Sequence, residues 1–160
     1  MIRSWLQPKP ALAHCDVPCG IYDPITAQTA ALSTARFLDQ LAEYADGAKS
    51  LEDQARLARI VAQKEKHAAE VKQEIVVIWG DFFKAPQFEA HPHLHELTHS
   101  ILLAASACKQ GVDPAAGRKL VDLVNEFAEI YWKIKEVPTK RVIVPYEPKL
   151  ELAQPIFPDA

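Results

Sequence analysis

Four stretches of this chain carry apolar residues at the spacing of an α-helix, and each stretch is closed by a residue that stops helices. The stretches open with a capping residue or a proline, at Asp23-Pro24, Ser50, Pro92 and Asp113-Pro114. They close at Asp46-Gly47, before Pro86, at Gly111 and at Pro138. Amphipathic helices joined by such short connections favour an antiparallel, up-down four-helix bundle.

The apolar positions of the four stretches define the expected core. The first stripe is Ile25, Leu32, Ala35, Leu38, Ala42 and Ala45. The second, the most regular, is Leu57, Ile60, Val61, Ala68, Val71, Ile75, Ile78 and Phe82. The third is Leu94, Leu97, Ile101, Ala104, Ala105 and Cys108. The fourth is Leu120, Leu123, Val124, Phe127, Ile130, Tyr131 and Ile134.

The segment after residue 138 cannot form a helix like the four stretches before it. Prolines at 145, 148, 155 and 158 forbid a helix, yet residues 142–144 and 156–157 are too apolar for a free tail. The segment is either a strap folded over its own bundle or an arm that docks on a neighbouring subunit. The expected fold class is therefore all-α, a four-helix bundle with a proline-rich extended C-terminal tail.

Bulk composition narrows the class of protein. A chain of 160 residues is long enough for one domain with a proper core. A net charge of -3 argues against nucleic acid or an anionic membrane as a partner, and no apolar run is long enough to cross a bilayer. Three cysteines cannot all pair, which fits a reducing compartment and predicts a cytoplasmic protein.

His14, Cys15 and Cys19 place three metal-ligating side chains within six residues. Tetrahedral zinc sites normally use two close pairs of ligands, and Cys108 lies alone in an apolar stripe where a buried, inert thiol is expected. So tight a loop can close around one ion only if backbone nitrogen atoms also bind it.

Residues 1–13 indicate how such a nitrogen could become available. This stretch has a positive charge at Arg3 and ends in Ala11-Leu12-Ala13, but it lacks the long apolar centre of an export signal. Cleavage after Ala13 would free the α-amine of His14. That amine, the Cys15 amide nitrogen and both thiolates would form a planar set with the imidazole as axial ligand, a geometry that suits nickel(II) or copper(II).

Residues 14–24, H-C-D-V-P-C-G-I-Y-D-P, resemble the nickel hook of the nickel-dependent superoxide dismutases, H-C-D-x-P-C-G-x-Y-D-P, at every fixed position. In that family the hook follows a removable leader. The resemblance continues through residues 79–84, W-G-D-F-F-K, and through residues 113–115 to Trp132. It covers residues 14 to about 135.

The resemblance implies a cytoplasmic homohexamer of four-helix bundles with one nickel ion per subunit. The enzyme would convert superoxide to oxygen and hydrogen peroxide as nickel cycles between Ni(II) and Ni(III). It also implies a leader at 1–13 removed by a leader-processing protease, the hook at 14–23 and the bundle at 24–137. The tail at 138–160 lies outside the family pattern.

By the same resemblance, the metal ligands are His14, Cys15 and Cys19. Tyr22 and Asp16 are the catalytic residues, with the Tyr22 hydroxyl positioning water or substrate beside the metal. Lys84 has two possible roles: its cation draws the superoxide anion inward, or it is a solvated lysine at a helix end.

Three positions depart from the family pattern. Some members orient the axial imidazole with a glutamate and an arginine, at positions that align here with Ala30 and His67. Phe82 replaces a usual tyrosine. His67 is one candidate for orienting the His14 ring, and a merely packed histidine is the other.

Two alternative functions compete with the dismutase. Residues 95–99, H-E-L-T-H, match the H-E-x-x-H pattern of zinc metalloproteases, with Glu126 or Glu129 as a possible third ligand. A surface cluster of His91, His93, His95 and His99 that binds stray metal weakly explains the same residues. The other alternative is a non-enzymatic redox switch, in which Cys15 and Cys19 form a disulfide.

Overall fold

The computed structural model describes residues 19–157, which are mostly helical. The elements in chain order are α1 (Ile25–Ala42), α2 (Leu51–Val77), the π-helix η1 (Ile78–Phe82), α3 (Ala85–Ala90), α4 (Leu94–Gln110), α5 (Pro114–Ile134), β1 (Thr139–Ile143) and β2 (Glu151–Pro155). His14, Cys15 and Asp16 lie outside the described residues.

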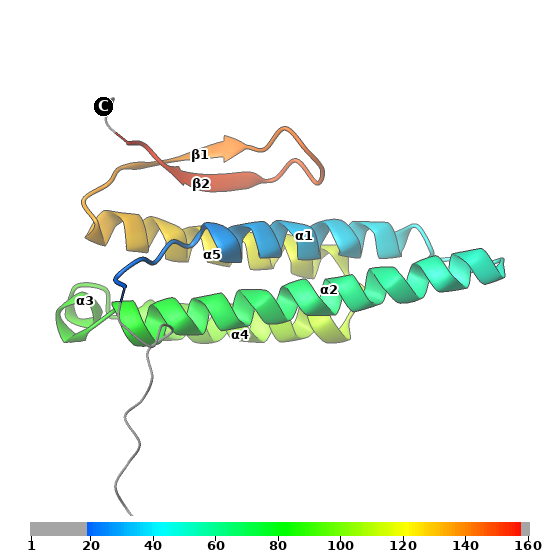
Figure 1. Ribbon diagram of the computed structural model, residues 1–160, viewed down its shortest axis with the longest axis horizontal. Helices are drawn as coiled ribbons and strands as arrows, with labels where there is room; N and C mark the ends of the chain where they lie inside the picture. Colours follow the sequence, from blue (N-terminus) through cyan, green and yellow to red (C-terminus); the bar gives the residue numbers. More distant parts are fainter. Residues whose placement is uncertain (1–18, 158–160) are drawn as a thin grey trace, which may run out of the picture.

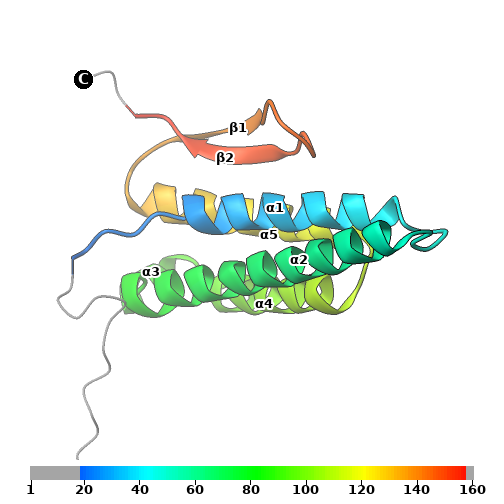
Figure 2. The ribbon, with the colours of Figure 1, turned by 45° about the vertical axis from the view of Figure 1, so that its right-hand side comes forward.

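The elements form three layers (Figure 1). The strands lie over α1 and α5, and these two helices lie over α2 and α4, an arrangement that Figure 2 shows from another side. Helix α1 packs against α2 and α5, and α4 packs against the same two helices. The prediction of a mostly helical chain is confirmed.

The predicted stripes supply the buried core of the described chain. Their fully buried members include Leu38, Ala68, Val71, Ile75, Ile101, Cys108, Val124 and Phe127. The ends of the first stripe are an exception, because Ile25 is 46% exposed and the helix ends at Ala42, before Ala45. Burial of these apolar side chains is the main force that holds the helices together.

The predicted capping residues act as caps. Ser50 and Asp53 form a capping box at the start of α2, in which the Asp53 N–H donates to Ser50 Oγ at 3.0 Å. The Asp113 carboxylate accepts a hydrogen bond from the Ala115 N–H at 2.9 Å. At the start of α1, the Asp23 carboxylate accepts one from the Ile25 N–H at 2.8 Å. Each cap satisfies a backbone donor that the helix itself leaves unpaired.

The second stripe does not run as one α-helix up to Phe82. After Val77 the backbone widens into the π-helix η1, and the Phe83 N–H donates to the Ile78 carbonyl five residues back, at 3.4 Å. This extra residue per turn brings both Ile78 and Phe83 into the core, each 2% exposed. The short helix α3 follows, which the apolar periodicity did not indicate.

The C-terminal segment forms a β-hairpin on its own bundle. Strands β1 and β2 pair antiparallel, with Val142 opposite Leu152 and Arg141 opposite Ala153. Leu152 and Ala153 are buried, and β2 packs against α5. Of the two possibilities open from the sequence, the strap over its own bundle is the one seen in this chain.

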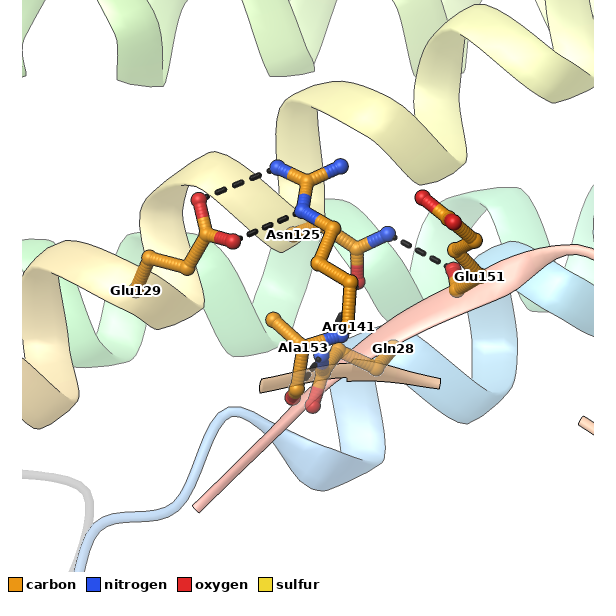
Figure 3. A network of polar contacts seen from close by, with 6 residues as sticks. All are labelled: Gln28, Asn125, Glu129, Arg141, Glu151 and Ala153. Carbon is orange, nitrogen blue, oxygen red and sulfur yellow. Dashed lines mark hydrogen bonds and ion pairs between the residues drawn. The ribbon is translucent and has the colours of Figure 1, made fainter. Parts of the chain in front are cut away.

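Two buried amide side chains hold the free edge of β2 (Figure 3). Asn125 Oδ1 accepts the Ala153 N–H at 3.0 Å, and Gln28 Nε2 donates to the Ala153 carbonyl at 2.8 Å. Gln28 Nε2 also lies 3.0 Å from Asn125 Oδ1, and Asn125 Nδ2 donates to the Glu151 carbonyl at 2.8 Å. We call Gln28 and Asn125 the amide clasp. The clasp supplies hydrogen-bond partners for backbone groups of β2 on the side that faces the bundle. A third strand is therefore not needed there to satisfy these groups.

An ion pair fixes the other strand of the hairpin, β1, to α5. Arg141 Nε donates to Glu129 Oε1 at 2.7 Å and a second guanidinium nitrogen donates to Oε2 at 3.0 Å, a two-pronged geometry seen in Figure 3. Hydrogen bonding to the Glu129 carboxylate raises the pKa of Arg141 above its usual value. The hairpin is thus joined to the bundle through both of its strands.

Candidate metal centre

Two of the five predicted site residues, Cys19 and Tyr22, lie in the part of the chain that the structure describes. They belong to the segment that runs along the end of the bundle into α1 (Figure 2). The other three, His14, Cys15 and Asp16, precede that part.

Cys19 has an exposed side chain, and its sulfur accepts a hydrogen bond from the Ile21 N–H at 3.5 Å. The turn between these residues depends on Gly20, whose φ of +70° is one that residues with side chains rarely adopt. The Cys19 sulfur is therefore accessible from outside the bundle, and its role as a metal ligand stays a prediction.

Tyr22 is half-buried at the end of the bundle. Its ring centroid lies 5.9 Å from that of Phe82 in η1, and its backbone carbonyl accepts a hydrogen bond from the Tyr131 hydroxyl of α5. Burial, together with the nearby Asp23 carboxylate, raises the pKa of Tyr131 above its ordinary value. The Tyr131 hydroxyl thus keeps its proton and remains a donor at physiological pH.

Two lysines lie close to η1. Lys84 Nζ donates to the Gly80 carbonyl at 3.3 Å, and Lys135 Nζ stands 4.9 Å from the centroid of the Phe82 ring. The Phe82 ring also contacts the ring of Tyr22. Phe82 therefore lies in contact with both the Lys135 cation and a predicted site residue. Sequence reasoning proposed Lys84 and missed Lys135, because only the fold brings the end of α5 next to η1.

Ala30 and His67 face a shared hollow of about 240 Å³ between α1 and α2. His67 Nδ1 lies 3.1 Å from Glu70 Oε2, and its ring stacks on Phe37 with centroids 5.8 Å apart. Glu70 of α2 also lines this hollow, so a carboxylate is present in the hollow that Ala30 faces. Whether His67 orients the His14 ring stays a prediction.

The H-E-x-x-H residues do not assemble a metal site. His95 Nδ1 accepts a hydrogen bond from Trp79 Nε1 at 3.1 Å, and its ring stacks on Phe88 with centroids 4.1 Å apart. Glu129, one possible third ligand, is engaged by Arg141. Within residues 19–157 no group of three or more His, Cys, Asp or Glu side chains could hold an ion. The protease alternative is therefore not supported.

Cys108 behaves as predicted for an inert thiol. It is completely buried in α4, and this burial raises the pKa of its thiol to about 11. Nearby, Lys64 is buried as well, and its ammonium group donates to the carbonyls of Lys109 and Gly111 at 2.8 and 2.7 Å. Burial lowers the pKa of Lys64. Lys64 thus caps the C-terminal end of α4, where orphan carbonyls need donors.

No helix between residues 19 and 157 combines the length and the apolar character that a bilayer crossing requires.

Residues 9–135 match the model of a protein family described as nickel-containing superoxide dismutase. The Superoxide dismutase [Ni] of Streptomyces seoulensis is 39% identical over 137 residues, which make up 85% of this chain and 99% of that relative. The Superoxide dismutase [Ni] of Streptomyces coelicolor is 36% identical over the same length and with the same coverage. The hairpin lies beyond the family match.

Solved structures agree. The native structure of a nickel superoxide dismutase is similar with a TM-score of 0.67 and 38% identity, over 76% of this chain and 99% of the other. A crystal structure of a Ni-containing superoxide dismutase, with nickel ligation corresponding to the oxidised state, gives a TM-score of 0.68 at 36% identity, over 77% and 99%. Because the family match spans most of the chain and these relatives align over nearly their whole length, this chain belongs to the nickel-containing superoxide dismutase family.

Proposed function

We propose that this chain converts superoxide to oxygen and hydrogen peroxide at a nickel ion held by the hook, residues 14–23. The observation that carries the proposal is the complete hook motif, which leads directly into α1. At its described end, an exposed Cys19 sulfur lies three residues from Tyr22, which the bundle holds through Phe82 and Tyr131.

The donor set fits nickel. The thiolates of Cys15 and Cys19, the Cys15 amide nitrogen, and the α-amine and imidazole of His14 would supply two sulfur and three nitrogen donors. When bound, nickel would supply Ni(II)/Ni(III) electron transfer, and the anionic sulfur and amide donors would stabilise the higher oxidation state. The exposed position of Cys19 supports this assignment, because its sulfur is accessible to an ion outside the bundle.

Tyr22 and Asp16 are the residues that interact with the substrate. The Tyr22 hydroxyl positions water or superoxide, and the contacts of its ring with Phe82 and of its carbonyl with Tyr131 limit how far it can move. Lys84 and Lys135 attract the superoxide anion toward this end of the bundle. Their charge raises the local concentration of substrate without taking part in the electron transfer.

The mature protein starts at His14, after a protease removes residues 1–13. It comprises the hook at 14–23, an antiparallel four-helix bundle at 24–137 and the tail at 138–160, which carries the hairpin. The subunits form a cytoplasmic homohexamer with one nickel ion each. Family membership supports this part of the proposal.

Mass spectrometry of the natively expressed protein, combined with elemental analysis, tests the proposal. The expected result is a chain that begins at His14, with one nickel ion per chain and superoxide consumption that disappears when a chelator strips the metal. An active enzyme that keeps residues 1–13, or one that works without nickel, would contradict it.

A further inference from the structure

A side chain of α5 reaches the backbone of the hook. The Tyr131 hydroxyl donates a hydrogen bond to the carbonyl of Tyr22, although 109 positions separate the two residues in the chain. This contact falls immediately after the Cys19–Ile21 turn and immediately before Asp23 caps α1. It therefore fixes the backbone at the point where the hook leaves the bundle.

The Tyr131 ring has little freedom to move. It is 2% exposed, and its centroid lies 4.7 Å from that of Phe82 and 5.1 Å from that of Trp132. Phe82 in turn contacts the ring of Tyr22 at 5.9 Å. Phe82 and Tyr131 therefore hold Tyr22 from two directions, one through its ring and the other through its carbonyl.

The hairpin extends this support. The Phe157 ring meets Trp132 edge-on at 5.7 Å, and the Ile156 N–H donates to the Pro138 carbonyl at 2.8 Å, which ties the end of β2 to the start of the tail. A continuous row of contacts thus leads from Phe157 through Trp132 and Tyr131 to Tyr22. Its first member, Phe157, lies beyond residue 135, where the family match ends.

We propose that Tyr131 is a positioning residue of the metal centre: by holding the Tyr22 carbonyl it sets the direction in which the Tyr22 ring and the Cys19 sulfur leave the bundle. This inference rests on the proposed function. The segment it restrains is short, exposed on both sides of Tyr22 and turned at Gly20, where φ is +70°. One buried anchor therefore removes much of the conformational freedom that metal binding would otherwise have to remove.

The variant Tyr131→Phe tests the proposal, because it removes the hydroxyl and keeps the packed ring. Tyr146→Phe is the matched control, since that tyrosine lies in the hairpin and is 54% exposed. Amide hydrogen exchange is measured on the full chain over residues 19–23. A net hydrogen bond is worth enough that exchange there should accelerate about fivefold in Tyr131→Phe and stay unchanged in Tyr146→Phe.

A second readout separates positioning from overall stability. In the nickel-loaded protein, Tyr131→Phe should change the sulfur-to-nickel charge-transfer absorption and lower kcat/KM for superoxide, with the helical circular dichroism unchanged. The loss in kcat/KM should shrink when Tyr22→Phe is already present, because the two changes then act on the same ring.

Unaltered exchange over residues 19–23 in Tyr131→Phe, or an unaltered nickel spectrum, would overturn the inference. So would a loss in kcat/KM of equal size with and without Tyr22→Phe. Failure of the proposed function would look different: the unsubstituted protein itself would contain no nickel and consume no superoxide.

Discussion

Gly117 of α5 lies directly against Ala35 of α1. A β-carbon added at position 117 would stand 2.7 Å from the Ala35 Cα and 3.0 Å from Leu38 Cδ1. The helix backbones can approach this closely only because position 117 carries no side chain. The pair sets the spacing between α1, which follows the hook, and α5, which carries Tyr131.

Replacing Gly117 with Ala should destabilise the protein. The new methyl group would force α1 and α5 apart, because the nearest atom is backbone and cannot rotate away. Overpacking of this kind typically lowers the free energy of unfolding by about 1–3 kcal/mol. Urea unfolding checks the loss. Gly80→Ala is the control, since a β-carbon there meets nothing within 4 Å and should cost little.

Asn125→Ala should release the hairpin from the bundle. The change leaves the Ala153 N–H and the Glu151 carbonyl without their partner in the amide clasp. Each buried group left unpaired costs about 1–3 kcal/mol. Hydrogen exchange at Ala153 should accelerate more than exchange in the core of α2. Gln154→Ala, on the same strand but outside the clasp, should leave exchange at Ala153 unchanged.

Serine at either hook cysteine should abolish dismutase activity. A hydroxyl does not ionise at neutral pH as a thiol can, so it cannot replace the anionic sulfur donor of Cys15 or Cys19. Superoxide consumption and nickel content are measured on the same preparations. Cys108→Ala should keep both, because Cys108 is buried in α4. Full activity in Cys15→Ser or Cys19→Ser would argue against the nickel site.

The buried thiol of Cys108 should make stability depend on alkaline pH. Its pKa is about 11 in the folded chain and 9.0 without burial. Between these values the unfolded chain loses the thiol proton while the folded chain retains it, so the free energy of unfolding falls as pH rises. The contribution is complete below pH 9 and is lost by pH 11, a change of about 3 kcal/mol.

Comparison with Cys108→Ala isolates this effect. The lowered pKa of Lys64 acts in the opposite direction below its usual value of 10.5, and Cys108→Ala alters it only by removing the charge of the Cys108 thiolate, which has less effect on Lys64 than burial has. From pH 9 to pH 11, the free energy of unfolding of the unsubstituted chain should therefore fall relative to that of Cys108→Ala. A constant difference over this range would contradict the prediction.

Substitutions in the H-E-x-x-H stretch should leave superoxide consumption intact, and only those that remove packing contacts should lower stability. His95→Ala loses the hydrogen bond from Trp79 and the stacking on Phe88, which should cost about 1 kcal/mol. Glu96→Gln should change neither stability nor superoxide consumption. A zinc protease would lose its activity with either change, so an assay with denatured protein as substrate separates the two functions.

The helices could be predicted from the sequence because their signals are local. The stripes repeat at helical spacing, and Ser50-Asp53 and Asp113 cap the helices that they were expected to cap. The π-helix could not be predicted, since it arises from the demand that Ile78 and Phe83 both be buried. The hairpin could not be predicted for a similar reason: Gln28 and Asn125, which hydrogen-bond its backbone, lie far away in the sequence.

The metal ligands stay a prediction, which the sequence allows because the hook places them within six residues. The residues that contact Tyr22 from the bundle could not be predicted. Tyr131 looked like one more apolar position in the fourth stripe, and only its hydroxyl, which a buried position must satisfy with a partner, distinguished it from a phenylalanine. Lys135 looked like an ordinary charge at a helix end until the fold placed it over Phe82.

The edge of β2 that Gln28 and Asn125 occupy bears on whether such a chain aggregates through strand pairing. A ribbon of two strands with both sides open is a seed onto which further strands, and eventually fibrils, can grow. Here Gln28 and Asn125 occupy one side, and β1 follows Pro138 and carries Lys140 and Arg141 on the other. An apolar C-terminal appendage can therefore be added to this bundle without nucleating polymerisation.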